Sequence, residues 1–72
     1  MKHEWLSIDF DGDPMAETFM ALVDGEPGSK DWRPAFYEDG KLLVRAHVPA
    51  GQYWIWSKVN GLATRHGTVR VD

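Results

Sequence analysis

The 72-residue sequence contains no cysteine and only three histidines. The absence of cysteine excludes disulfide bonds, thiolate zinc sites and cysteine nucleophiles. His3, His47 and His66 are scattered, and none has a second histidine or a carboxylate at a spacing typical of a metal site or a catalytic triad. We therefore interpret the histidines as ordinary surface or strand residues.

Long apolar segments are also absent. The longest purely apolar run covers residues 19–23, far short of the roughly 20 residues that a membrane span needs. Residues 1–4 lead into no apolar segment of the kind that a secretory signal peptide contains. We therefore expect a protein that is made and kept in a reducing, aqueous compartment and that does not bind a membrane.

The chain has no excess of positive charge. Its net charge is −3 and its pI is about 5.5, which argues against nucleic-acid binding, because such modules carry basic faces. The charges are unevenly placed: residues 1–39 contain ten acidic and three basic side chains, and residues 40–72 contain one acidic and five basic ones. This asymmetry predicts either a dipolar surface that orients a partner or a second copy, or interleaved strands whose charges average out.

No constellation typical of catalysis is present. No serine lies in a nucleophile elbow, no glycine-rich loop leads into a helix, and no pair of carboxylates lies on strands that are expected to face each other. A domain of this size also has little room for a cavity that excludes water. We expect a protein that is not an enzyme and that uses no cofactor.

An acidic segment resembles the start of a calcium-binding loop. It contains Asp9, Asp11 and Asp13, but an EF-hand needs Gly at the sixth position and Glu at the twelfth, where Pro14 and Met20 stand. We interpret this segment as a solvated acidic turn after the first strand. A weak calcium site at the three aspartates remains the alternative, and no metal site is predicted elsewhere.

Aromatic side chains are abundant for such a short chain, with four Trp, two Tyr and three Phe. A domain of this length buries only about 60% of the surface of its unfolded chain, so its core is thin. Each aromatic side chain buries roughly 150–250 Å². We expect these residues to supply much of the core of a single domain that covers residues 1–72, with association as a second source of stability.

Turn residues recur at short intervals and predict an all-β sandwich or small barrel. They lie at residues 11–14, 24–28, 39–40, 49–51 and 60–61. Residues 18–23 are interpreted as a strand, although the spacing of the apolar residues in 15–23 leaves a helical turn open. Residues 24–33 are predicted to be a loop. The expected strands cover residues 4–10, 18–23, 35–38, 41–48, 52–59 and 67–71.

Two hairpins are predicted from local residues. Asp39-Gly40 is typical of a type I′ turn, in which both central residues have positive φ. Asn60-Gly61 would pair Val59 with Leu62, but strict alternation from Leu62 then turns Val69 and Val71 away from the core. We therefore expect one extra residue, a β-bulge, within residues 65–67.

Trp54 and Trp56 point to one face of a strand, and Tyr53 and Ile55 point to the other. If the face with the two tryptophans is exposed, it predicts a binding surface for protein or sugar. If the strand is central, the opposing sheet covers one face and the loop of residues 24–33 covers the other. In either case we expect Trp32, at the end of that loop, to anchor the loop on the domain.

Two segments of the chain share a pattern with a known group. They are DGEPGSKDWRPAFYEDG (residues 24–40) and VPAGQYWIWSKVNGLATRHGTVRVD (residues 48–72), and they resemble small virion-associated proteins of tailed phages of actinobacteria. In this chain the pattern rests on Asp31, Trp32, Ala50, Gly51, Tyr53, Trp54, Trp56, Val59, Gly67 and Val69. It departs at residues 60–65, where that group has a longer excursion containing proline.

The resemblance implies a small immunoglobulin-like β-sandwich of about six to seven short antiparallel strands, with residues 18–23 as a strand. It also implies a non-enzymatic capsid-associated minor or decoration protein of a phage virion, assembled in the host bacterial cytoplasm. The partners would be the major capsid protein or other virion proteins, with a second copy of the chain as a further candidate. The candidate partner-binding residues are Trp32, Trp54, Trp56, Arg45, Arg65 and Arg70.

Two other functions stay open. The same fold can serve at the head–tail connector or in the tail or baseplate, where few copies would be present. Alternatively, Trp32, Trp54 and Trp56 form a stacking platform for glycans. Exposure of Trp54 and Trp56 is the feature that separates the glycan hypothesis from the others.

Overall fold

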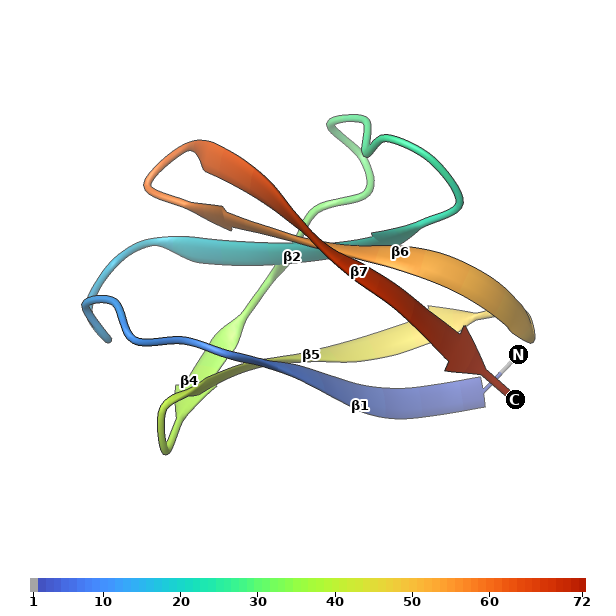
Figure 1. Cartoon of the computed structure of the whole chain (residues 1–72), viewed down its shortest axis with the longest axis horizontal. Helices are drawn as coiled ribbons and strands as arrows, with labels where there is room; N and C mark the ends of the chain where they lie inside the picture. The colour runs from blue at the N-terminus through green and yellow to red at the C-terminus, as the bar shows by residue number, and fades with distance from the viewer. Residues whose placement is uncertain (1) are drawn as a thin grey trace.

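The computed structural model describes the backbone of residues 2–72 and the side chains of residues 5–72. These residues form seven strands and no helix. The strands are β1 (Lys2–Asp9), β2 (Thr18–Val23), β3 (Arg33–Pro34), β4 (Phe36–Glu38), β5 (Lys41–Val48), β6 (Gly51–Val59) and β7 (Leu62–Val71). All pairings are antiparallel, in one sheet of order β1-β5-β4 and another of order β3-β2-β6-β7. The predicted all-β sandwich is confirmed (Figure 1).

The core lies between the two sheets. Its centre consists of Met20 from β2, Leu42 and Val44 from β5, and Ile55 from β6. Alternation along β5 is as predicted, because Leu42, Val44 and Ala46 are buried whereas Arg45 and His47 are exposed. Strand β2 lies in the segment whose apolar residues also have the spacing of a helical turn. It is a strand because it pairs with β6 over its whole length, and its residues are buried on both faces.

The strand order matches an immunoglobulin domain from its second strand onward. Sheet β1-β5-β4 corresponds to strands B, E and D, and sheet β3-β2-β6-β7 corresponds to C′, C, F and G. A second feature agrees with this assignment. Tyr53, near the start of β6, donates a hydrogen bond of 2.6 Å from its hydroxyl to the backbone carbonyl of Pro49. A tyrosine at this corner that bonds to the backbone a few residues upstream is typical of immunoglobulin-like sandwiches.

Both predicted hairpins are confirmed. Asp39 and Gly40 have φ values of 49° and 77°, and Asn60 and Gly61 have φ values of 48° and 86°, as type I′ turns require. The bulge is also present: Ile55 pairs with Gly67 and Trp56 pairs with Arg65, which leaves His66 as the extra residue. Val71 is therefore returned to the core.

Several strand boundaries differ from the predictions. The first strand covers Lys2–Asp9 instead of residues 4–10, because the ladder with β5 extends to Lys2↔Val48. The last strand begins at Leu62 instead of residue 67, because the Asn60-Gly61 turn is followed directly by pairing with β6. Residue 33 lies in the short strand β3, and Ala35 lies in the crossover between the sheets, outside β4.

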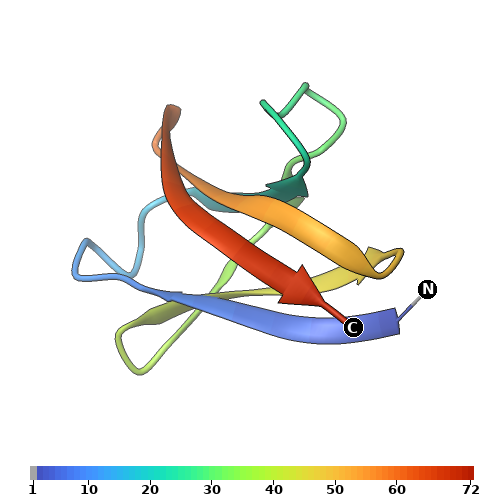
Figure 2. The ribbon, with the colours of Figure 1, turned by 45° about the vertical axis from the view of Figure 1, so that its right-hand side comes forward.

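The charge asymmetry of the sequence is partly preserved in space. The acidic half contributes β1 and β2, which pair with β5 and β6 of the basic half, so the strands do interleave. However, the strands of the four-stranded sheet contain no acidic residue. Their charged side chains are Arg33, Lys58, Arg65 and Arg70. Figure 2 shows the two sheets crossing, with β7 at the free edge of the four-stranded sheet.

Candidate functional site

Trp54 and Trp56 lie on the outer face of β6 and are half-buried. The guanidinium carbon of Arg65, on β7, is 4.2 Å from the centre of the Trp54 ring. The indole N–H of Trp56 donates a hydrogen bond of 3.3 Å to the carbonyl of Gly25 in the loop between β2 and β3. The tryptophans therefore already pack against groups of their own chain, as expected of a central strand covered by this loop.

Trp32 belongs to the same covered face. The ammonium group of Lys58 lies 4.5 Å from the centre of the Trp32 ring and 5.5 Å from that of Phe19. Cation–π contacts of this kind contribute about 0.5–1 kcal/mol each at exposed sites. Trp32 thus joins the loop to the outer face of the sheet, as predicted. A glycan that stacks on Trp32 or Trp54 would have to use the ring face opposite the cation.

The three candidate arginines do not form one cluster. Arg65 and Arg70 lie on β7 and are exposed, and Arg70 forms an ion pair of 3.3 Å with Asp72. Arg45 lies on β5, in the other sheet, and is exposed there. The structure therefore groups Trp54, Trp56 and Trp32 with Arg65, and it separates Arg45 from them.

A different set of aromatic side chains is exposed on the outer face of the three-stranded sheet. Trp5 of β1 is 59% exposed and Phe36 of β4 is 58% exposed, and their rings meet edge to face with centroids 6.0 Å apart. Leu43 of β5 lies between these strands, and Glu38 completes the lining of a shallow hollow of about 430 Å³. We call Trp5, Phe36 and Leu43 the aromatic patch.

The aromatic patch was not predicted, although the sequence contains a signal for it. Leu6 and Ile8 alternate inward in β1, so Trp5 must point outward. Phe36 reaches the patch through the Asp39-Gly40 turn, which sets Phe36 opposite Leu43. Arg45 pairs with Trp5 in the β1–β5 ladder and therefore lies beside the patch. The candidate Arg45 thus has an exposed aromatic neighbour that sequence reasoning missed.

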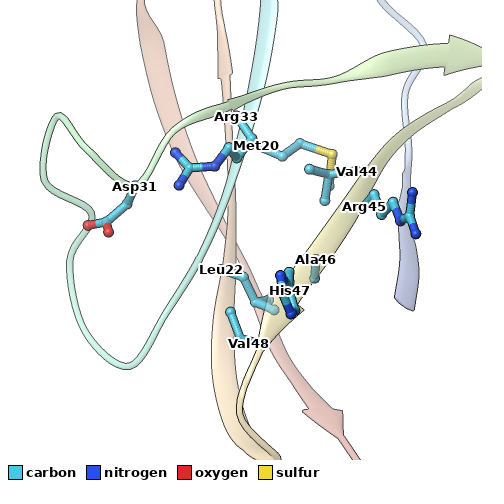
Figure 3. Close-up of a pocket in the computed structure, with 9 residues that line it drawn as sticks. All are labelled: Met20, Leu22, Asp31, Arg33, Val44, Arg45, Ala46, His47 and Val48. Atoms are coloured by element: carbon cyan, nitrogen blue, oxygen red, sulfur yellow. The ribbon is translucent and has the colours of Figure 1, made fainter. Parts of the chain in front are cut away.

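A groove of about 330 Å³ opens between the two sheets beside β5. Figure 3 shows Met20 and Leu22 of β2 facing Val44 and Ala46 of β5 across it. Asp31 and Arg33, from the loop and from β3, lie at its other side. The groove therefore has an apolar floor with charged groups at its rim.

The acidic turn after β1 is held by contacts within the chain. Asp9 forms an ion pair of 2.9 Å with Lys41, and Asp13 accepts a hydrogen bond of 2.9 Å from the backbone N–H of Met15. In the part of the chain that the structure describes, no group of three or more His, Asp or Glu side chains is placed to hold a metal ion. Binding of calcium by Asp9, Asp11 and Asp13 stays an untested alternative.

One histidine has a partner in the core. His66 Nε2 and the hydroxyl of the buried Ser57 are hydrogen-bonded at 2.6 Å. His66 is exposed and is the extra residue of the bulge, so this contact satisfies a buried polar group of β6. In this structure His66 serves as the hydrogen-bond partner of Ser57.

No family model, curated protein or solved structure matches this chain. No helix among the described residues is long and apolar enough to cross a membrane. The resemblance to phage virion proteins therefore stays a prediction.

Proposed function

We propose that this protein is a non-enzymatic structural component of a tailed-phage particle, a capsid-associated minor or decoration protein that binds and stabilises the shell. The resemblance of residues 24–40 and 48–72 to small virion proteins supports this role. The structural observation that carries the proposal is the aromatic patch. Two large rings that are more than half exposed, side by side on one sheet, are typical of a surface that docks on another protein.

The patch has the composition of an interface centre. Trp and Arg are enriched among the residues that contribute most to protein–protein binding, and here Trp5 and Arg45 are cross-strand neighbours. The hollow bordered by Trp5, Phe36 and Leu43 offers a place for an apolar side chain of the partner. A partner that binds only the folded domain also adds stability by mass action, which suits a domain with a thin core.

The first test of the proposal is quantitative mass spectrometry of purified phage particles from the source, which gives copies of this chain per shell subunit. We expect a ratio near one, or a simple fraction of it, as for a protein that decorates the shell. A handful of copies per particle would instead assign the protein to the connector, tail or baseplate. Absence from the particles would overturn the virion role.

A second test asks whether the patch makes the contact. Phage particles that lack this protein are mixed with the purified wild-type chain or with Trp5→Ser. The variant should co-sediment with the particles much less than the wild-type chain does, because the patch loses its larger ring. Met15→Ser is the matched control, since Met15 is an exposed apolar residue in the β1–β2 loop, outside the patch. Equal binding by both variants would show that the shell contacts another surface.

A further inference from the structure

The groove beside β5 exists because two short strands stop early. The chain passes from one sheet to the other at Ala35, between β3 and β4. Strand β3 pairs with β2 only at Phe19 and Met20, and the pairing of β4 along β5 stops at Leu43. Beyond these points the second half of β5 still pairs with β1 on one side. On its other side it borders the groove instead of a neighbouring strand of the described chain. The sandwich is therefore open on this side.

The main-chain groups of Arg45 point toward this opening. Main-chain N–H and C=O groups alternate between the two sides of an antiparallel strand with a period of two residues. The Phe10 N–H, directly after β1, donates a hydrogen bond of 2.8 Å to the carbonyl of Gly40, directly before β5. The main-chain N–H and C=O groups of even-numbered residues of β5 therefore point toward β1. Odd-numbered residues then face β4, as Leu43 does where it pairs with Phe36. Arg45 continues this series beyond the end of β4.

The side chains around the opening indicate what would occupy it. A strand added beside β5 would alternate between two faces. Its inward side chains would meet Met20, Val44 and Ala46, which are apolar. Its outward side chains would lie beside Arg45, which is exposed on the outer face of the sheet. An added strand with apolar side chains on its inward face and an acidic side chain on its outward face is therefore complementary to this opening.

The charged residues at the rim of the groove also favour a negatively charged occupant. Arg33 lies there with one carboxylate, Asp31, and Arg45 adds a positive charge from the outer face of β5. Asp31 already accepts a hydrogen bond of 2.7 Å from the backbone N–H of Gly28. Arg33 donates to the carbonyl of Lys30 through Nη1 at 2.7 Å, and a guanidinium has further N–H donors to offer. An acidic occupant is complementary to this rim.

We propose that this groove accepts an extended, acidic segment of a partner protein as an added strand on β5, with apolar side chains in the groove and a carboxylate beside Arg45. Strand addition of this kind draws its affinity from main-chain hydrogen bonds and its specificity from alternate side chains. The proposal deepens the proposed function by naming the strand edge that docks. It depends on that function only for the source of the partner.

The test uses the full chain labelled with ¹⁵N and three synthetic peptides with blocked ends. The first is Ser-Val-Glu-Val-Glu-Val-Ser, the second has Lys in place of Glu, and the third is the first peptide with N-methyl groups on its two Glu residues, whose N–H groups face β5 when a Glu lies opposite Arg45. We expect the Glu peptide to shift the amide signals of residues 43–47 and to protect the Arg45 amide from hydrogen exchange. The N-methylated peptide should fail to do so, because it cannot donate the ladder hydrogen bonds.

Charge reversal provides the second readout. Arg45→Glu should weaken binding of the Glu peptide by about fivefold, in line with exposed ion pairs, and should invert the preference between the Glu and Lys peptides. Thr64→Glu is the control, because it adds a carboxylate at an exposed position of the far strand β7, and it should leave both affinities unchanged. An amide spectrum of each variant without peptide checks that it is folded.

Three outcomes would overturn the proposal. They are no binding of the Glu peptide, equal binding of the N-methylated peptide, and shifts that map to the aromatic patch instead of residues 43–47. These outcomes are distinct from a failure of the virion role. Peptide binding by a chain that is absent from phage particles would leave the strand-accepting groove intact and reject only the particle as the source of the partner.

Discussion

The hydroxyl of Tyr53 donates a hydrogen bond of 2.6 Å to the carbonyl of Pro49, four residues earlier in the chain. Pro49 follows the last residue of β5, and Tyr53 lies near the start of β6. Because these strands belong to different sheets, the bond closes the corner at which the chain passes from one sheet to the other. The bond thereby links the segment after β5 to the start of β6.

Removing this hydroxyl should weaken the corner. Tyr53→Phe should lower the free energy of unfolding by about 1 kcal/mol, the usual net contribution of one hydrogen bond, and lower Tm by about 4–8 °C. Thermal unfolding followed by circular dichroism measures the change. Tyr37→Phe is the control, because the Tyr37 ring keeps its edge-to-face contact with Phe10. Equal losses in the two variants would contradict the importance of the corner bond.

A pair of leucines tests the position of the core. Leu42 is 0% exposed at the centre of the sandwich, whereas Leu62 is 74% exposed after the second turn. Leu42→Ala should cost about 2–5 kcal/mol, because it removes buried methyl groups and leaves a cavity. Leu62→Ala should change stability by less than about 0.5 kcal/mol. Urea unfolding of both variants gives the comparison, and a similar midpoint for the two would place the core elsewhere.

The bulge can be tested by deleting its extra residue. Without His66, alternation from Leu62 turns Val69 and Val71 outward, and burying one valine contributes about 1.5–3 kcal/mol. The deletion should therefore cost at least about 2 kcal/mol. His66→Ala keeps the residue count, loses only the bond to Ser57, and should cost less. If calorimetry gives the two variants the same Tm, the bulge does not set the register of β7.

The four tryptophans should differ in their access to solvent. Trp5 is exposed, whereas Trp32, Trp54 and Trp56 are half-buried. Trp5→Phe should therefore remove most of the fluorescence that acrylamide quenches readily, and Trp54→Phe should remove a fraction that is quenched more slowly. Stern–Volmer plots of the two variants check this order. The reverse order would mean that the face of β6 with Trp54 and Trp56 is the open aromatic surface of the domain.

Local features of the fold were predictable because their causes are local. Asp39-Gly40 and Asn60-Gly61 adopt positive φ at both central residues, and few other residue pairs do so at low cost. The bulge followed from the period of two along a strand. Val69 and Val71 share a face with Leu62 only if one extra residue lies between Leu62 and Val69. The strand at residues 18–23 needed more, because its apolar spacing also suits a helical turn.

The candidate site was harder to predict, because exposure depends on what covers a face. Trp54 and Trp56 look like a binding surface when their strand is considered alone. In the folded chain, Arg65 packs on Trp54 and the backbone of Gly25 accepts a bond from Trp56. Trp5 and Phe36 are far apart in sequence and became neighbours only when β1 and β4 paired with opposite sides of β5.

The sequence by itself determined the two type I′ turns, the bulge and the alternation along the strands at residues 4–10 and 41–48. Each of these depends on backbone preferences or on a period of two within a few residues. Only the tertiary structure decided which faces are open. The aromatic patch requires β1, β4 and β5 to lie side by side, and the groove beside β5 requires β3 and β4 to end early on different sheets. Such surfaces are made by contacts between distant segments, which no local pattern specifies.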